Sequence, residues 1–399
     1  MTQMTKEQLQ ELLSENSNLA GMDLSEMQLE GLDFSGAELK GAELIRSSFQ
    51  GVDFSEADLA GCDLEESNLQ GASFREATLM GATLVDANLQ GADLTGADLR
   101  GTTFSTVNLE AIEDTVYEKE DGTLQDVELE AGEGNLANLS GANLTDTNLA
   151  GSNLTGINME GCVLKYANIQ GNFGMANLGG ADMEEVNASG AYMSGAYLSR
   201  ANLKNAHLGG TQLRDADLRG ANLEGCDMRG ANLRSALLQR ANLQKTILRG
   251  TILWNANLED ANCTEADFRG INCSEEHFQG ATLIKANLQG IDLSKANFKD
   301  ANLDEAWLQS SHMHEINLEN ASLKEARLYR ADLTGANLQN ADLRGADFSE
   351  AKLIDVDFKG ADLTGCQFEG ANFDGANLSG ATYTEADLEG AFYAETEST

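Results

Sequence analysis

The stretch LAGMDLSEMQLEGLDFSGAELKGAEL, residues 19–44, places a large apolar residue at every fifth position. Each unit reads small residue, often Asp or Asn, then Leu or Phe, then two mostly polar residues. A period of five matches neither the 3.6-residue helix nor the two-residue strand. It fits a short extended piece with two inward side chains, the small residue and the Leu or Phe, followed by a turn. The pattern therefore predicts a coil with sides of five residues.

Glycine and phenylalanine indicate the shape of that coil. Glycine recurs at every tenth position from Gly21 to Gly101, and it adopts the positive φ required at the third residue of a type II turn. Alternate corners are therefore predicted to differ in turn type. Phe34, Phe54 and Phe74 are spaced four repeat units apart. Like rings stack if four sides complete one turn, so we expect a four-sided β-helix with an aromatic ladder inside.

Units such as ADLTG and ANLQG resemble those of the pentapeptide repeat family, and the resemblance extends from Leu19 to Tyr393. It implies an all-β fold, a right-handed quadrilateral parallel β-helix. The absence of proline agrees, because each coil needs its N–H groups for the next. Some members, the quinolone-resistance and mycobacterial gyrase-inhibitor types, are acidic proteins that bind DNA gyrase where DNA would lie. Similar repeat modules occur in bacterial secretion systems.

The first residues predict a short α-helix that caps the open first coil, within residues 1–17. Thr5 is the expected N-cap, and Gln8 three residues later completes a capping-box pattern. The apolar face of this helix is expected to consist of Leu9, Leu12 and Leu13.

Residues 18–110 form the first predicted β-helix segment and residues 136–399 the second. The second contains a register slip near 170–173, because Ile169 and Phe173 are four residues apart instead of five. No helix is expected at the C-terminal end. The last coil is therefore expected to be covered by the C-terminal tail, by a partner, or by a second copy of the chain joined end to end.

Between the two segments, at residues 111–135, the repeat lapses for most of its length. The dipeptide Asp121-Gly122 is a hairpin-turn signal, so we expect a projecting acidic loop or hairpin. Loops on rigid scaffolds often carry recognition, and a tolerated acidic insertion is the alternative. The recognition candidates in this segment are Tyr117, Glu118, Lys119, Glu120 and Asp121.

The net charge of −39 argues against nucleic acid as a direct ligand. Residues 196–250 are the exception, with nine basic and four acidic side chains, or +5. Like charges stacked one rung apart are unfavourable, so basic columns invite an acidic partner or phosphate. The alternatives are a solvated surface with cation–π packing, and contact between this basic region and the acidic end of a second copy of the chain. The candidates are Arg229, Arg249 and Arg269 in one column, and Arg214, Arg234 and Trp254 in the next.

Catalytic and metal chemistry have little support in the sequence. His312 and His314 share the outer surface, with Asp292 and Asp332 one coil away on either side, which makes the two histidines a weak metal-site candidate. The six cysteines occupy inward positions and lack C-x-x-C spacing, so we expect small core residues. Neither a nucleophile triad nor a nucleotide-binding motif emerges. We expect no cofactor and no enzymatic activity.

These observations favour a non-enzymatic bacterial scaffold for protein–protein interaction. Without a secretory signal pattern or an apolar run of about 18 residues, the expected location is the cytoplasm, with no membrane contact. One alternative is an acidic DNA mimic that binds a type II topoisomerase. Residues 20–110 carry 17 acidic and 4 basic side chains, or −13, over about 22 Å of coils, close to the charge density of duplex DNA. The other alternative is an accessory protein of a secretion system.

Overall fold

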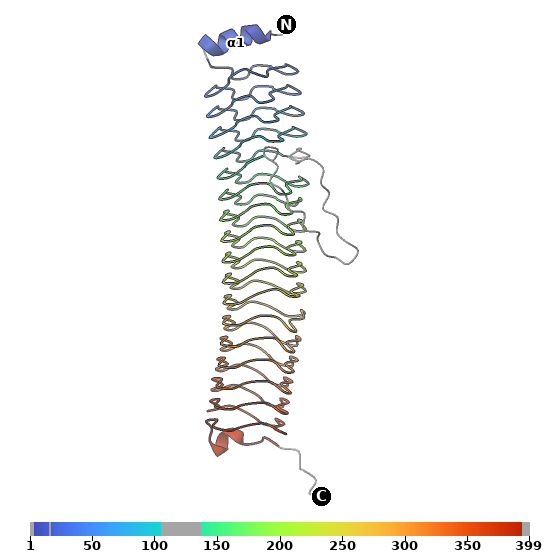
Figure 1. The fold of residues 1–399 in the computed structure, drawn as a ribbon, viewed down its shortest axis with the longest axis vertical. Coiled ribbons are helices and arrows are strands. Elements are labelled where there is room, and N and C mark those ends of the chain that lie inside the picture. The colour runs from blue at the N-terminus through green and yellow to red at the C-terminus, as the bar shows by residue number, and fades with distance from the viewer. Residues whose placement is uncertain (1–3, 16, 105–136, 393–399) are drawn as a thin grey trace. The chain divides into compact units, whose positions relative to one another are not determined.

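The computed structural model describes residues 4–15, 17–104 and 137–392. The chain divides into two compact units, unit 1 at Met1–Asn187 and unit 2 at Ala188–Thr399. The named helices are the α-helix α1, Lys6–Glu15, in unit 1 and the short 3-10 helix η1, Glu385–Leu388, in unit 2. Apart from these helices, each described unit is a stack of similar coils (Figure 1). Among the described residues, no helix is long and apolar enough to cross a membrane.

Parallel bridges between positions four repeat units apart join successive coils. In unit 1 they include Asp23 with Glu43 and Asp33 with Asp53, and in unit 2 they run from Tyr192–Gln212 to Asn372–Phe392. The amide of Leu24 donates to the Glu43 carbonyl at 2.8 Å. With one side every five residues, this register confirms four sides per coil. It also explains why proline is absent, because a proline would remove a rung.

The core lies inside the coils and consists of the two inward residues of each side. Phe34, Phe54 and Phe74 are buried, and their ring centroids are 5.1 and 5.0 Å apart along the stack. The predicted aromatic ladder is therefore confirmed in unit 1. Where serine, threonine or cysteine occupies the small inward position, its side chain donates a hydrogen bond to a backbone carbonyl inside the coils. For example, the Thr102 hydroxyl donates to the Leu79 carbonyl at 2.9 Å.

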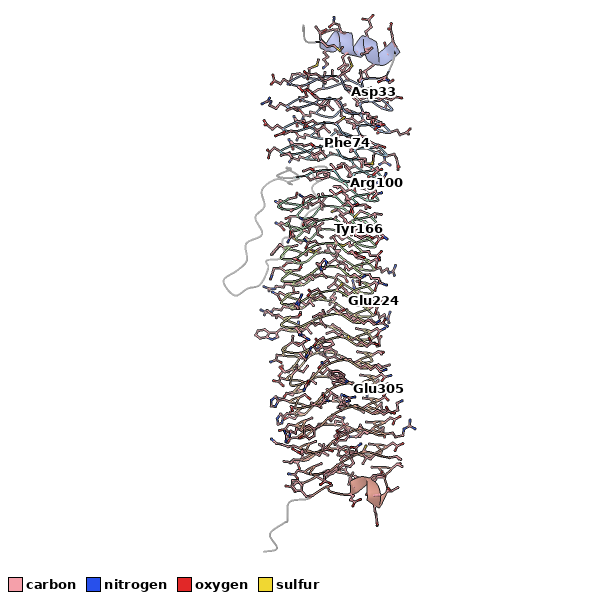
Figure 2. All side chains as sticks on the ribbon, turned by 180° about the vertical axis from the view of Figure 1, so that it is seen from behind. Asp33, Phe74, Arg100, Tyr166, Glu224 and Glu305 are labelled. Atoms are coloured by element: carbon pink, nitrogen blue, oxygen red, sulfur yellow. The ribbon has the colours of Figure 1, made fainter. Side chains whose placement is uncertain are left out.

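The outward Asp or Asn before each central residue stabilises the corner that follows it. The Asp23 side chain accepts a hydrogen bond from the Ser25 amide at 3.0 Å. In unit 2 the Asn222 amide group also donates to the Asn202 side chain one coil away, at 3.0 Å. This pairing explains the residue preference at the position. Figure 2 shows the outward side chains along the coils, with Glu224 labelled.

The corners do not alternate in the way the glycine spacing predicted. The third turn residue has positive φ at glycine corners, as at Gly21 with 65°, and also at glutamate corners, as at Glu26 with 61°. The glycine spacing therefore does not mark corners that differ in φ, because the ladder imposes this left-handed residue at both kinds of corner. A non-glycine residue there costs roughly 1–2 kcal/mol, which the neighbouring rungs offset.

The described ladder of unit 1 changes its register at two places. Across residues 105–136, Thr103 bridges Asn148 instead of pairing at the regular interval, so the ladder skips five whole repeat units. Farther along, Asn153 bridges Asn172, an interval one residue shorter than the regular one. At this slip the Gly171 amide donates to the Ile169 carbonyl at 2.7 Å. A side chain at Gly171 would place Cβ 2.6 Å from the Ser152 carbonyl oxygen, so the slip requires glycine.

The helix α1 covers the first coil of unit 1. The Thr5 amide donates to the Gln8 side chain at 2.9 Å and the Gln8 amide donates to the Thr5 hydroxyl at 3.3 Å, which forms the expected capping box. Leu9 is fully buried, while Leu12 and Leu13 are half-buried.

The C-terminal end of unit 2 differs from the expectation, because η1 lies there. Its Asp387 carboxylate accepts from the Thr384 amide at 2.6 Å and from the Gly365 amide at 2.8 Å. The sequence EADL is too short to show a helical apolar period, so pattern analysis missed it. The last coil still exposes Tyr383 and Phe392, at 39% and 49%.

Replacing Gly171 by alanine should lower the free energy of unfolding by about 1–3 kcal/mol, because the new Cβ would collide with backbone. Gly209→Ala is the matched control, since its Cβ would have the Arg229 carbonyl oxygen, at 3.7 Å, as its nearest contact. The control should be neutral or stabilising by up to about 1 kcal/mol. Urea denaturation followed by circular dichroism measures both, and equal effects would contradict this account of the slip.

Candidate functional site

The predicted recognition loop, residues 111–135 with Tyr117, Glu118, Lys119, Glu120 and Asp121, lies outside the described residues. The described coils on either side are joined by the bridge between Thr103 and Asn148. The ladder of unit 1 therefore closes across the segment.

The first arginine column carries its own counter-ions. Arg229 forms an ion pair with Asp227, and the Nε of Arg249 lies 2.6 Å from Asp267 Oδ2. Arg269 contacts the same Asp267 carboxylate at 2.8 Å. The hydrogen bond from Arg229 lowers the pKa of Asp227. The stacked guanidinium groups are thus compensated within the chain, which the sequence analysis did not foresee.

The second column is mixed. Arg214 Nε lies 3.2 Å from Asp215 Oδ2, and the Arg214 side chain is mostly covered. Arg234 is exposed, and Trp254 is 58% exposed. Within the described chain, the cation–π contacts lie elsewhere, at Arg327 over Trp307 and at Arg330 over Tyr329. Trp254 is therefore a solvent-facing aromatic side chain beside a basic region.

The histidine pair lies on the outer surface, as the sequence indicated. The His312 and His314 rings are nearly parallel, with centroids 6.4 Å apart. His312 bridges Asp292 on one side and Asp332 on the other, and His314 Nε2 lies 3.5 Å from Asp332 Oδ2. Lys352 also binds Asp332, at 2.9 Å. In the described ranges, no group of three or more His, Cys, Asp or Glu residues has the arrangement of a metal site.

All six cysteines are buried and free, as expected for core residues. Burial raises the pKa of Cys62 to about 11 and that of Cys162 to about 12. Thiols with such pKa values are protonated at neutral pH and poor nucleophiles. Cys366 donates to the Leu343 carbonyl at 3.0 Å, which satisfies its polar hydrogen inside the coil.

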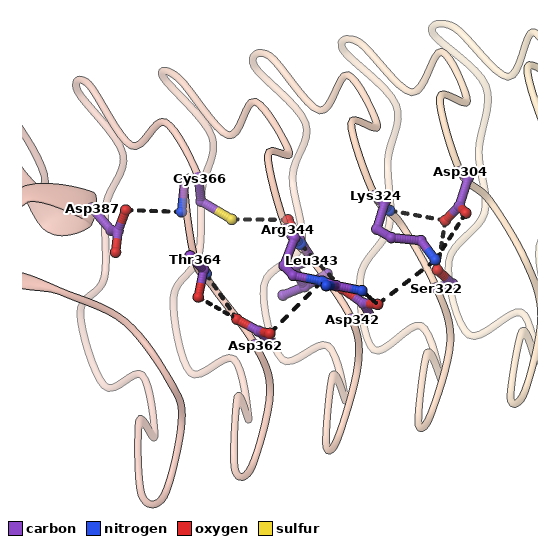
Figure 3. Close-up of polar contacts among 11 residues, drawn as sticks. Asp304, Ser322, Lys324, Asp342, Leu343, Arg344, Asp362, Thr364, Cys366 and Asp387 are labelled. Atoms are coloured by element: carbon purple, nitrogen blue, oxygen red, sulfur yellow. Dashed lines mark hydrogen bonds and ion pairs between the residues drawn. The ribbon is translucent and has the colours of Figure 1, made fainter.

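Alternating charges connect several coils near the end of unit 2 (Figure 3). Lys324 lies 3.2 Å from Asp304 and 3.7 Å from Asp342. Arg344 contacts Asp342 at 2.7 Å and Asp362 at 3.8 Å. Exposed pairs contribute little individually, but a network holds its side chains in fixed positions. This surface of unit 2 is therefore ordered and largely self-neutralised.

The structure also shows two shallow hollows that sequence analysis did not identify, both in unit 2. One, of about 280 Å³, is lined by Arg200, Arg219, Gly220, Gln239, Arg240, Glu259 and Asp260. The other, of about 380 Å³, is lined by Glu265, Lys285, Glu305, Trp307, Glu325 and Arg327. The basic charge of residues 196–250 indicated the region of the first hollow. The arginines that line it, however, lie on other columns than the arginines named as candidates in the sequence analysis. The regular spacing of Arg200, Gly220 and Arg240, one coil apart, was the available signal.

Glu276 occupies an inward position that is alanine one coil away on either side, at Ala256 and Ala296. It is 3% exposed. Its Oε1 accepts a hydrogen bond from the Asn255 amide at 3.0 Å, while Oε2 has no hydrogen-bond partner among the described residues. Burial raises the pKa of Glu276 to about 7, although the amides of Asn255 and Ala256 lower it in part.

The ladder is interrupted beside this carboxylate. In regular coils of unit 2 the corner amide donates to a carbonyl in the next coil, as Ser235 does to Trp254 at 2.8 Å. Asn255 donates to the Glu276 side chain instead. In this described stretch, no bridge joins Ile252 to Asn272, although both form bridges on their other sides. A buried acidic group thus replaces part of one rung.

The Glu276→Ala variant should therefore be more stable than the native chain at neutral and higher pH. The folded-state pKa is about 7, above the ordinary value, so the pH-dependent cost of the native residue is absent below about pH 4 and grows as the pH rises to about 7. The difference in free energy of unfolding should reach roughly 3 kcal/mol at about pH 8 and shrink at about pH 4.

Urea denaturation at several pH values measures this difference. Gly209→Ala, which changes no titratable group, is the control and should show a difference that does not change with pH. A pH-independent difference for Glu276→Ala as well would show that the carboxylate titrates normally.

A protein-family model described as "Pentapeptide repeats (8 copies)" matches most of the chain. The matched residues are 15–51, 47–84, 72–110, 142–171, 172–205, 196–234, 236–272, 277–314, 311–350 and 351–390. Among curated proteins, no sequence matches the chain significantly.

Several solved structures are similar to the chain. The pentapeptide repeat protein HetL, involved in heterocyst differentiation regulation in the cyanobacterium Nostoc sp. strain PCC 7120, is 28% identical over 65% of this chain and 96% of its own, with a TM-score of 0.26. A pentapeptide repeat protein of the Arabidopsis thaliana thylakoid lumen is 35% identical over 25% of this chain and 72% of its own, with a TM-score of 0.21.

QnrB1, a plasmid-mediated fluoroquinolone resistance protein, is 21% identical over 54% of this chain and 89% of its own, with a TM-score of 0.22. The family assignment rests on the family model, which covers well over half of the sequence. The chain belongs to the pentapeptide repeat family, and its coils form a right-handed quadrilateral β-helix.

Proposed function

We propose that this protein is a non-enzymatic cytoplasmic scaffold that binds another protein through residues 111–135 and its charged faces. The observation that best supports this proposal is that side chains fill the interior of the coils. In the regular coils that the structure describes, each side directs two side chains inward, mostly a small residue and a Leu, Phe or Met, and these side chains are buried. With the exception of Glu276, charged side chains in the regular coils are therefore confined to outward columns at a spacing of about 4.8 Å. Such a surface suits a partner with complementary spacing better than it suits a substrate.

The ion pairs support this use of the surface. Lys324, Asp342 and Arg344 hold one another in fixed positions (Figure 3). A partner that binds a preorganised surface loses less side-chain entropy than one that must order it. Fixed charge patterns also discriminate against wrong partners through like-charge contacts.

The role of residues 111–135 is supported by the register. Because Thr103 bridges Asn148 directly, the coil stack closes although the chain between them is five repeat units longer than one turn requires. The segment can therefore vary without removing a rung, which is the usual property of recognition loops on rigid scaffolds.

Affinity capture from lysate tests this proposal, with the full chain compared with a variant in which one short turn replaces residues 111–135. We expect a specific partner to be retained by the full chain and lost with the segment. Circular dichroism must show that the variant keeps its β-helix. Equal capture by both proteins would show that the segment is a tolerated insertion.

A DNA mimic that binds a type II topoisomerase is the second candidate function. The observation that favours it is a set of acidic columns in unit 1, where Asp33 bridges Asp53 and Glu38 bridges Asp58. In the same capture experiment, duplex DNA and high salt should both displace a topoisomerase, because DNA competes for the same binding surface and salt screens the charges. A captured secretion component that ignores DNA would instead favour an accessory role in secretion.

We also propose that two copies associate end to end through their C-terminal coils. Tyr383 and Phe392 are exposed there, and aromatic side chains are common in interfaces. Phe392→Glu should weaken this association, which sedimentation velocity over a range of concentrations would detect. A native chain that stays monomeric at the highest concentration would contradict the proposal.

A further inference from the structure

One side of a coil in unit 2 lacks its backbone hydrogen bonds to the next coil. One coil earlier on the same side, the Leu233 amide donates to the Ile252 carbonyl at 2.7 Å. The amides of Leu253 and Asn272, on the two edges of the next rung, have no backbone acceptor among the residues that the structure describes. The gap is confined to one side, which we call the open side (residues 250–256 and 270–276). The other three sides of these two coils keep their bridges, which are Leu237–Asn257, Asn242–Asn262 and Ile247–Asp267.

Glu276 lies at the end of the open side and replaces part of its missing rung. Its Oε1 accepts a hydrogen bond from the Asn255 amide at 3.0 Å. In a regular coil that amide would donate to the Ser274 carbonyl, which here accepts no backbone hydrogen bond in the described chain. Glu276 Oε2 is buried and also has no partner there. A proton on Oε2 would therefore give the open side a donor for one of its unpaired carbonyl oxygens.

The two protonation states of Glu276 differ in what they offer the open side. A protonated carboxyl group has one O–H donor and an accepting oxygen, whereas an ionised carboxylate can only accept. A buried charge without full hydrogen bonding also costs free energy, which entering water reduces. Burial raises the pKa of Glu276 to about 7, although the amides of Asn255 and Ala256 lower it in part. Both states are therefore populated near neutral pH.

Few charges lie around this carboxyl group. The facing corner of the preceding coil contributes Asn255 and Ala256, which carry none. Inside the coil, burial raises the pKa of Cys263 to about 12 and that of Cys273 well above its ordinary value, so both thiols stay protonated. The remaining titratable neighbours, by their position in the coils, are Glu275, His277, Asp292 and Lys295. Histidine commonly changes charge near neutral pH, so the histidine in this group requires its own control.

We propose that Glu276 is a proton-operated clasp that holds the two coils together across the open side. In the protonated form, Oε1 accepts from the Asn255 amide and Oε2 donates to a carbonyl oxygen that the missing rung leaves unpaired. When the group ionises, its proton passes to solvent, the donor is lost and water enters the gap. The clasped form holds one proton more than the opened form, so opening increases as the pH rises through about 7, the pKa of the group.

The clasp concerns the chain by itself and goes beyond the proposed scaffold role. Ile252 and Trp254 lie on the open side and are 44% and 58% exposed. Their surroundings change when the gap fills with water. The surface that unit 2 presents at this point therefore depends on pH.

Hydrogen exchange of the full chain, followed by mass spectrometry from about pH 5 to about pH 9, tests the clasp. The measured quantity is the exchange rate of residues 250–256 divided by that of residues 330–336, each corrected for its intrinsic rate at that pH. The reference residues lie on the same side of unit 2 in an intact rung, where the Leu333 amide donates to the Lys352 carbonyl at 2.9 Å. The ratio should rise above about pH 7 by up to about tenfold per pH unit, the limit for one linked proton.

Trp254 supplies a second readout. The chain has two tryptophans, so in a Trp307→Phe background the indole fluorescence comes from the open side. Its intensity should change over the same pH range as the exchange ratio, because water enters beside the ring.

Two substitutions remove the titrating group. Glu276→Gln keeps a neutral side chain that both accepts and donates, so residues 250–256 should stay protected at every pH. Glu276→Ala introduces the residue type found at this position in the two neighbouring coils, and it should also abolish the pH dependence. His277→Asn is the matched control, because the neighbouring coils have asparagine at that position, and it should keep the native transition.

An exchange ratio that stays constant with pH in the native chain would overturn the proposal, even if the stability of the chain varies with pH. A transition that persists in Glu276→Gln or Glu276→Ala would also overturn it, since another group would then be titrating. Loss of the transition in His277→Asn would assign the switch to the histidine instead. Circular dichroism must show that each variant keeps its β-helix, and should Glu276→Gln fail to fold, Glu276→Ala decides the question.

Discussion

The structure depends on one constraint, the hydrogen bonding of each coil to the next along all four of its sides. The Leu24 amide and the Glu43 amide bond to carbonyls in neighbouring coils, at 2.8 and 2.9 Å. This ladder fixes the distance between coils and holds the corner residues in positive φ. It also leaves a narrow interior, in which most sides pair one large side chain with one small one. The sequence repeats every five residues because each side of a coil has this same geometry.

Because every coil repeats the last, the outer surface is a set of columns, and many of the charged columns neutralise themselves. Arg249 and Arg269 share Asp267, and Lys324 lies between Asp304 and Asp342. Such a stretch offers a partner little unpaired charge. Distinct surface chemistry arises where a column is broken, as it is at Gly220, which has no side chain between two arginines.

The ladder also tolerates defects of different kinds. Residues inserted in whole units leave the inward and outward positions unchanged, so Thr103 can bridge Asn148. A single missing residue needs a special backbone, which Gly171 supplies. A charged residue at an inward position lowers stability the most. Glu276 is the example, because its carboxylate loses hydration and replaces a backbone carbonyl as the acceptor of the Asn255 amide. Each defect is local because each coil contacts only its neighbours.

The sequence alone determined the four-sided coil, the inward cysteines, the aromatic ladder and the capping box, because each follows from spacing or from a contact between residues three apart. It also placed His312 and Asp332 in neighbouring coils. It could not determine which charges pair, because Arg229 and Asp227 meet through side-chain conformations that no period encodes. The uniform corners, the lost rung beside Glu276 and the hollow between Arg200 and Arg240 were decided by the tertiary structure. They depend on hydrogen bonds and open space between coils, which arise only when residues four repeat units apart in the sequence are brought together.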